Sequence, residues 1–282
     1  MSYINFNGKL ITADTAIAEA GNRGLRYGDG LFETIKFKHN QFQLLEPHLE
    51  RLWKGLHLMK FDLPKLFTPD LIKNELLKLV QKNKQTHARV RLTIIRGNGG
   101  LYDATDLTPR FIIESWPLAA DFGQLNSNGL QLGIYRHALK PCDDFCNLKH
   151  NNFLPYLMGA LFAKEKKYND AIILNQHSRI CDTTIANIFI IKNGQVKTPA
   201  LPEGCIAGTM RRFLLQQLPA MNISVTETAI TATELLSCDE IFVTNAISPI
   251  KWVASVDDHT LSNEHTLKIY NQLCKTLPDI FC

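Results

Sequence analysis

The 282-residue sequence lacks any apolar run near the roughly 18 residues that a membrane-spanning helix needs. Its first residues, MSYINFNGKLI, have neither the basic segment nor the long apolar core of a signal peptide. No repeat or low-complexity tract is present. Together with 45% hydrophobic and 21% charged residues, these absences are typical of a globular protein. We expect a cytoplasmic protein that does not bind membranes.

The sequence also lacks a large excess of either positive or negative charge. The net charge is only +4, from 31 basic and 27 acidic residues. The basic residues are dispersed and the aromatic residues lie in apolar stretches, so no surface of the kind that binds nucleic acid is expected.

The sequence also lacks a cysteine pattern typical of disulfide-bonded proteins. The seven cysteines are an odd number scattered through the chain, which fits reduced thiols better than a disulfide framework. Cys142 and Cys146 are the closest pair, but no second pair or histidine cluster accompanies them. We therefore expect no metal site.

Turn signals divide the chain into strands and helices. Asn-Gly pairs at 7–8 and 193–194 lie between apolar stretches and predict hairpins. Pro47 is expected at the first position of a helix with apolar residues at helical spacing. The segment ADFGQLNSNG, residues 120–129, is the best candidate for a linker. We expect an α+β protein with a small N-terminal domain, 1–119, and a larger C-terminal domain, 120–282.

Lys149 stands apart from the other lysines of its region. It lies among Asn147, His150, Asn151 and Asn152, just before an apolar segment expected to be helical. A lysine amine can form a Schiff base with a carbonyl compound, most often pyridoxal phosphate. That cofactor needs a carboxylate at its ring nitrogen, and helix N-terminal amides, often with an arginine, at its phosphate.

Three features of the sequence, one before Lys149 and two after it, could supply these cofactor contacts. Asp182, just before an expected strand, offers a carboxylate. Gly208 lies at a loop-to-helix junction, where the amides of Thr209 and Met210 could bind an anion. Arg51, on the first long helix, offers a cation. Each has a structural alternative: Asp182 could cap a turn, Thr209 could be a plain N-cap, and Arg51 could lie on a solvated helix face.

Seven segments, taken in order, resemble the class IV aminotransferase family. This family of pyridoxal-phosphate enzymes of fold type IV includes branched-chain and D-amino-acid aminotransferases and aminodeoxychorismate lyase. The segments are RYGDGLFETIKF, PHLERL, RLTIIRGNGG, NLKHNNFLPYLMGALFAKEKKYNDAIILN, TTIANIFIIKNG, IAGTMRRF and DEIFVTNAISPI, and they span almost the whole chain. The resemblance implies a two-domain α+β fold, pyridoxal 5′-phosphate as cofactor, and a homodimer.

The resemblance also implies roles for single residues. Lys149 matches the Schiff-base lysine, which would act as the catalytic residue and lie in the C-terminal domain. Arg51 matches the phosphate-binding arginine. The amides of Thr209 and Met210, and the loop at Asn245-Ala246, match further phosphate contacts.

Asp182 departs from the family pattern. It falls where the family usually has glutamate, so the charge is kept but the side chain is one methylene shorter. Asp170 and Asp239 do not match the family's position. We expect Asp182 to serve the ring nitrogen, either with a slight shift of the ring or through a bridging water.

The segments leave the reaction open. RGNGG and NAISPI look closest to aminodeoxychorismate lyase, which releases pyruvate and 4-aminobenzoate. D-amino-acid enzymes carry an arginine and a histidine after the glycine turn, and related lyases also place an arginine there; GGLYDATDL has none of these. Tyr27, Arg96 and Tyr102 are candidates for the substrate pocket, with ordinary packing or a surface position as the alternative for the tyrosines.

We therefore place an aminotransferase acting on a small amino acid and an oxo acid first, as the broader class. Aminodeoxychorismate lyase is the alternative. A protein that binds pyridoxal phosphate without turnover is a more remote alternative, which the departure at Asp182 would permit.

Overall fold

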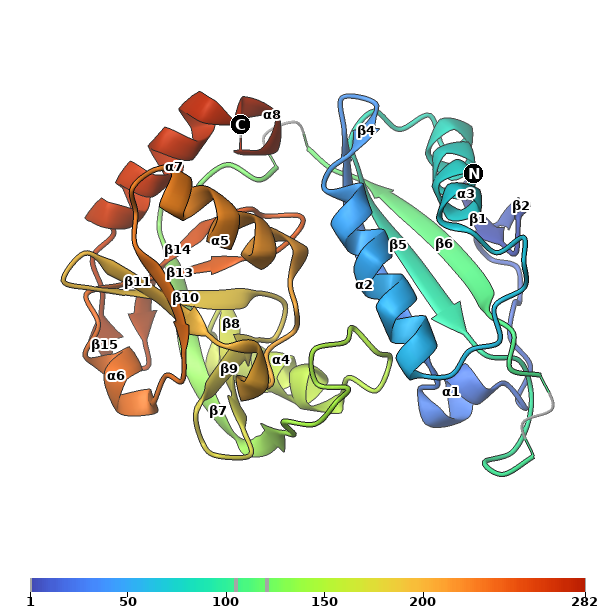
Figure 1. The fold of residues 1–282 in the computed structure, drawn as a ribbon, viewed down its shortest axis with the longest axis horizontal. Coiled ribbons are helices and arrows are strands. Elements are labelled where there is room, and N and C mark those ends of the chain that lie inside the picture. Colours follow the sequence, from blue (N-terminus) through green and yellow to red (C-terminus); the bar gives the residue numbers. More distant parts are fainter. Residues whose placement is uncertain (1, 104–105, 120–121, 282) are drawn as a thin grey trace. The chain divides into compact units, whose positions relative to one another are not determined.

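The computed structural model describes residues 2–103, 106–119 and 122–281, and it divides into two compact units (Figure 1). The first unit comprises residues up to 120 together with Leu148–Phe153. The second comprises residues 121–147 and 154–282. The short segment that contains Lys149, which was expected in the C-terminal domain, thus groups with the first unit.

The first unit is built on a six-stranded sheet in the order β2-β1-β6-β5-β3-β4. All neighbouring strands in it are antiparallel. The hairpin predicted at Asn7-Gly8 is confirmed, and both residues have the positive φ that its tight turn requires. The strands are β1 (Tyr3–Phe6), β2 (Lys9–Thr12), β3 (Gly30–Lys38), β4 (Gln41–Phe42), β5 (Ala88–Ile95) and β6 (Arg110–Pro117).

Two long helices cover this sheet, α2 (Leu45–Leu58) on β3 and α3 (Pro69–Lys82) on β1 and β6. A short helix, α1 (Arg23–Tyr27), precedes β3. Pro47 is the third residue of α2 and not the first, so the expected start was wrong by two positions. Proline is tolerated there because the first amides of a helix have no intrahelical acceptor.

The second unit contains a nine-stranded mixed sheet in the order β12-β11-β10-β13-β14-β7-β8-β9, with β15 paired to β14. Strand β9 also contacts β10 and β11, so the sheet curls around its own core. The hairpin predicted at 193–194 is confirmed between β10 and β11. The strands are β7 (Leu130–Lys140), β8 (Asp170–Asn175), β9 (Ile180–Thr183), β10 (Asn187–Lys192), β11 (Gln195–Pro199), β12 (Val225–Thr228), β13 (Glu240–Thr244), β14 (Lys251–Val256) and β15 (His259–Thr260).

Helices of the second unit pack on this sheet, α4 on β7 and β8, and α7 on β13. They are α4 (Leu154–Lys166), α5 (Thr209–Ala220), α6 (Ala232–Leu236), α7 (Glu264–Thr276) and α8 (Pro278–Phe281), with a 3-10 turn at Leu201–Glu203. The helix expected after Lys149 is α4. None of the helices in the described ranges combines the length and the apolar character that crossing a membrane requires.

Most of the described cysteines are free thiols, as expected. Those found free are Cys142, Cys146, Cys181, Cys205 and Cys238. Cys274 is disulfide-bonded, so the expectation of reduced thiols was wrong at that position. Within residues 2–103, 106–119 and 122–281, no group of three or more His, Cys, Asp or Glu side chains could hold a metal ion.

Candidate active site

Lys149 is held beside β3 by main-chain hydrogen bonds. The amide of Phe32 donates to the carbonyl of Lys149 at 2.8 Å, and the amide of Asn151 donates to the carbonyl of Gly30 at 2.9 Å. A β-bridge joins the same two segments in antiparallel register. The backbone at Lys149 is therefore fixed by β3, although it lies outside every regular element.

The side chain of Lys149 lies against two aromatic rings. Its Nζ is 4.4 Å from the ring centroid of Phe32 and 5.4 Å from that of Phe153, and the two rings meet edge to face. The residue is half-buried. Cation–π attraction stabilises an ammonium group in this position, while the rings keep water from one side of it. Held against these rings, the amine has a defined position from which it could react with a carbonyl compound.

Arg51 on α2 is bound to Glu33 on β3. Its Nε and Nη2 donate to the two carboxylate oxygens of Glu33 at 2.8 and 2.5 Å. The Nδ1 atom of His48 lies 2.6 Å from the same carboxylate. The side chain of Arg51 is only 10% exposed, so the alternative of a solvated helix face was wrong.

The pKa values of Glu33 and His48 depend on their burial and on the charged groups beside them. Burial raises the pKa of Glu33, but the positive charge of Arg51 and the interaction with His48 outweigh burial and lower it to about 2. Burial lowers the pKa of His48 from its ordinary value. His48 is therefore neutral at pH 7 and donates through Nδ1–H, because a carboxylate can only accept.

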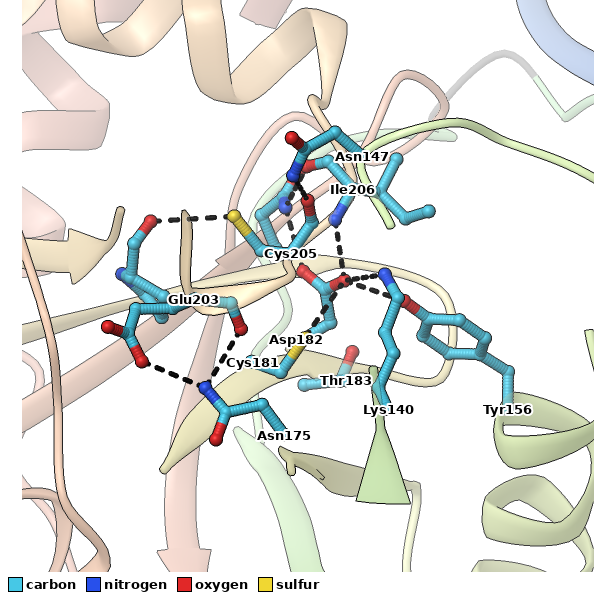
Figure 2. A network of polar contacts seen from close by, with 12 residues as sticks. Lys140, Asn147, Tyr156, Asn175, Cys181, Asp182, Thr183, Glu203, Cys205 and Ile206 are labelled. Atoms are coloured by element: carbon cyan, nitrogen blue, oxygen red, sulfur yellow. Dashed lines mark hydrogen bonds and ion pairs between the residues drawn. The ribbon is translucent and has the colours of Figure 1, made fainter. Parts of the chain in front are cut away.

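In the second unit, Asp182 accepts hydrogen bonds at both carboxylate oxygens (Figure 2). Oδ1 accepts from Nδ2 of Asn187 at 2.8 Å. Oδ2 accepts from the hydroxyl of Tyr156 and from the amide of Ile206, both at 2.8 Å, and Nζ of Lys140 lies 3.7 Å away. Asp182 is 2% exposed, and these partners offset the cost of burying its carboxylate.

Asp182, Tyr156 and Lys140 interact through charge and hydrogen bonds. Burial raises the pKa of Asp182, while the charge of Lys140 and the hydrogen bonds from Ile206 and Tyr156 oppose that shift. Burial, reinforced by the Asp182 carboxylate, raises the pKa of Tyr156 well above its ordinary value. Tyr156 is thus a phenol that donates to Asp182, and it accepts from Nζ of Lys140 at 2.6 Å.

Helix α5 begins beside this network. Gly208 is its N-cap, and no side chain caps the helix, so the alternative of Thr209 as a plain N-cap was wrong. A Cβ at Gly208 would lie 1.9 Å from Oδ1 of Asn187, which explains why glycine occupies this position. Thr209 and Met210 form the first turn, where amides without an intrahelical acceptor and the helix dipole favour an anion.

The loop at Asn245-Ala246 is a tight turn stabilised by its own asparagine. Oδ1 of Asn245 accepts from the amides of Ile247 and Ser248 at 2.9 and 2.7 Å. The amide of Asn245 donates to the carbonyl of Ser248 at 3.1 Å. Asn245 therefore shapes the loop, which leaves the amide of Ala246 as the loop's best candidate for an anion contact.

The substrate candidates all lie in the first unit, in different settings. Tyr27 ends α1 with its side chain exposed, and Tyr102 is 98% exposed. Arg96 is buried, and its Nη1 lies 3.1 and 3.2 Å from the two carboxylate oxygens of Asp29. Its Nη2 donates to the carbonyl of Met59. These contacts suit a structural arginine better than one that binds substrate.

The predicted residues fall into two groups. Lys149 and Arg51 lie in the first unit. The remaining cofactor candidates lie in the second unit, and they are Asp182, Gly208, Thr209, Met210, Asn245 and Ala246. The partners Lys140, Tyr156 and Glu33 were not predicted, because nothing local in the sequence marks a residue whose contacts come from distant segments.

Comparisons of the sequence identify relatives. A sequence profile of the family described as amino-transferase class IV matches residues 30–256. Aminodeoxychorismate lyase of Vibrio harveyi is 29% identical over 238 residues, which cover 84% of this chain and 86% of the relative. A putative branched-chain-amino-acid aminotransferase of Methanocaldococcus jannaschii is 26% identical over 282 residues, which cover 98% and 96%.

Solved structures share the fold and confirm the α+β architecture of fold type IV. Branched-chain aminotransferase from Thermoproteus uzoniensis, solved with norvaline, matches with a TM-score of 0.85 at 22% identity over 99% of this chain and 98% of that chain. A second branched-chain amino acid aminotransferase, solved with pyridoxamine 5′-phosphate, matches at 0.82 and 17% identity over 92% and 87%. Because the family profile covers most of its length, the chain belongs to the class IV aminotransferases, enzymes that use pyridoxal 5′-phosphate.

Proposed function

We propose that this protein is an aminotransferase acting on a small amino acid and an oxo acid, with Lys149 as the residue that binds the cofactor covalently. The observation that carries the proposal is the position of Lys149. Its backbone is fixed by β3 and its amine lies against Phe32 and Phe153. A lysine that only served solubility would need neither feature.

The chain offers a group for each part of pyridoxal 5′-phosphate. Lys149 suits the aldehyde. Arg51 in the first unit and the first amides of α5 in the second unit are each candidates for the phosphate. Asp182 suits the ring nitrogen. Its Oδ1 accepts one hydrogen bond, from Asn187, and a carboxylate oxygen can accept about two, so a donor on a bound ring can be accommodated despite the shorter side chain.

When bound, the cofactor supplies a ring that withdraws electrons from the substrate Cα. The amine of Lys149 would then take the proton from the substrate Cα as a general base and deliver it to C4′ of the cofactor as a general acid. Asp182 contributes negative charge at the ring nitrogen. We place Tyr27 and Tyr102 among the candidates for substrate contacts, whereas the ion pair with Asp29 argues against Arg96 in that role.

Aminodeoxychorismate lyase is the second candidate function. It is supported by the 29% identity to the Vibrio harveyi lyase and by the segments RGNGG and NAISPI. The two reactions share removal of the Cα proton and differ in the step that follows, so the residues described above serve both. Binding of the cofactor without turnover is the remote alternative.

Absorption spectroscopy tests the proposal. The purified protein, loaded with pyridoxal 5′-phosphate, is mixed in turn with L-glutamate, L-leucine, D-alanine and aminodeoxychorismate. A visible band that is lost with an amino acid and returns with an oxo acid indicates an aminotransferase. A band that persists while aminodeoxychorismate yields pyruvate indicates the lyase, and a band that responds to no substrate indicates binding without turnover.

Chemical trapping tests the assignment of Lys149. Borohydride reduction followed by peptide mass spectrometry should place the cofactor on the peptide that contains Lys149. The Lys149→Ala variant should show no visible band, whereas the exposed Lys164→Ala control should keep it. Trapping on any other lysine would show that Lys149 does not hold the cofactor.

We also propose a homodimer, which the resemblance implies, and a location in the cytoplasm, which the composition indicates. Light scattering of the purified protein measures its oligomeric state. A mass equal to twice that of the 31.9 kDa chain is the expected result, and a mass equal to one chain would contradict it.

A further inference from the structure

Lys140 is a buried lysine beside the carboxylate proposed to serve the cofactor. It ends strand β7, and its side chain is 4% exposed. Its Nζ lies 2.6 Å from the hydroxyl of Tyr156 and 3.7 Å from Oδ2 of Asp182. Figure 2 shows the three side chains converging from β7, α4 and β9. A lysine is seldom buried unless its charge is paired.

Among the ionisable groups near Asp182, Lys140 supplies the largest share of the positive charge. Burial, together with the Asp182 carboxylate, raises the pKa of Cys181 well above its ordinary value and that of Cys205 to about 12, so both are neutral thiols at pH 7. Arg211 of α5 forms its ion pair with Glu227, and its charge lowers the pKa of Asp182 less than the charge of Lys140 does. Within the described part of the second unit, Lys140 is the cation within ion-pair distance of Asp182.

The two carboxylate oxygens of Asp182 have different surroundings. Oδ2 accepts from Tyr156, Ile206 and, at 3.9 Å, Sγ of Cys181, and it faces Lys140. Among the described residues, Oδ1 accepts only from Asn187. Three hydrogen bonds, the one from Cys181 long, and an ion pair therefore anchor Oδ2, and Oδ1 is the oxygen that can accept from a bound ligand. Lys140 and Tyr156 act on the oxygen that the ligand does not use.

We infer that Lys140 is a positioning residue of the cofactor site, which holds Asp182 ionised and anchored through Oδ2, directly and through Tyr156, so that Oδ1 can pair with the ring nitrogen. This inference rests on the proposed function, because it takes Asp182 as the partner of the cofactor ring. It explains how an aspartate can serve where the family usually has glutamate. Lys140 holds the shorter side chain of Asp182 in one position and in its ionised form.

A double-mutant cycle on the protein without added cofactor tests the charge pairing. The variants are Lys140→Met, Asp182→Asn and the double variant, compared by thermal unfolding at pH 7. Each single variant leaves one buried charge without its partner, so the double variant should lose clearly less stability than the sum of the two losses. Additive losses would show that Lys140 merely packs there. Lys38→Met, at a buried lysine in the first unit, reports the cost of removing any buried lysine.

Cofactor affinity as a function of pH tests the role at the site. The Lys140→Met variant should bind pyridoxal 5′-phosphate about tenfold or more weakly at pH 7. The ratio of the variant's dissociation constant to that of wild type should fall toward one as the pH rises. Without its cation, Asp182 regains its negative charge only at higher pH. A ratio that is constant from about pH 6 to pH 9 would overturn the inference, since a packing defect has no such dependence.

Two further results keep the test decisive. If Lys140→Met does not fold, Tyr156→Phe removes the bridging hydroxyl and keeps both charges. It should still weaken cofactor binding severalfold, and unchanged binding would overturn the inference. If wild type shows no cofactor band at all, the proposed function fails, but the double-mutant cycle still decides whether Lys140 and Asp182 are coupled.

Discussion

Arg51 and Glu33 form a two-point ion pair that links helix α2 to strand β3, with distances of 2.8 and 2.5 Å. The imidazole of His48, one turn before Arg51 on the same helix, binds the same carboxylate. The guanidinium proposed to bind phosphate is therefore held in place by the protein itself. A cation fixed in this way loses less conformational entropy when an anion binds.

Replacing Glu33 by glutamine should reduce the sensitivity of the fold to acid. The pKa of Glu33 is lowered to about 2 from 4.5, so its contribution is complete above about pH 4.5 and is lost as the pH falls toward 2. A shift of that size corresponds to roughly 3 kcal/mol. The variant should be less stable by about that amount at pH 7 and lose less on acidification. Urea unfolding at a series of pH values measures this.

Glu46→Gln is the matched control, because Glu46 lies exposed on the same helix. It should change the free energy of unfolding by less than about 0.5 kcal/mol at any pH. Parallel pH profiles for wild type and the Glu33 variant would contradict the assignment of the acid-sensitive stability to Glu33.

Alanine at Gly30 should disturb the segment that carries Lys149. A Cβ there would lie 2.1 Å from the carbonyl oxygen of Ile94 and 2.5 Å from Nδ2 of Asn151. Main chain cannot move aside as a side chain can, so we expect a loss of about 1–3 kcal/mol and faster hydrogen exchange at the amide of Asn151. Gly21→Ala is the control, because its nearest atoms lie at 3.8 Å. Unchanged exchange at Asn151 would show that β3 does not hold this segment.

Alanine at Gly208 should affect the start of α5 and the Asp182 network together. The new Cβ would displace the side chain of Asn187, which lies 1.9 Å from its position and donates to Asp182. We expect weaker binding of pyridoxal 5′-phosphate by about tenfold or more, since one hydrogen bond to a charged group is disturbed. Equilibrium titration of the apoprotein measures this, and wild-type affinity would show that Asn187 can rearrange at no cost.

Replacing Arg96 by methionine should lower stability more than substrate affinity. The change leaves Asp29 buried with one fewer cation, although Arg23 still pairs with it. Losing one partner of a buried pair costs about 3 kcal/mol. Urea unfolding should show this loss, whereas Arg26→Met at an exposed position should be close to neutral. A stable variant with a raised KM would instead return Arg96 to the substrate pocket.

Local sequence was sufficient for the features that depend on neighbouring residues. The Asn-Gly hairpins at 7–8 and 193–194 were predicted because few residues tolerate the positive φ of such turns. Lys149 and Asp182 were singled out by residue type and context, and the family by the order of its motifs. The hairpins depend on interactions within a few residues, and each family motif is a short segment that can be recognised without the fold.

Contacts between distant segments were decided only by the tertiary structure. The segment at Lys149 pairs with β3, more than a hundred residues earlier in the chain, and Asp182 meets Lys140 and Tyr156 from two other elements. A lysine that ends a strand and a tyrosine in the first turn of a helix look the same in sequence whether they face water or a buried carboxylate. Burial and charge pairing arise when the elements pack, and packing sets the charge at Asp182.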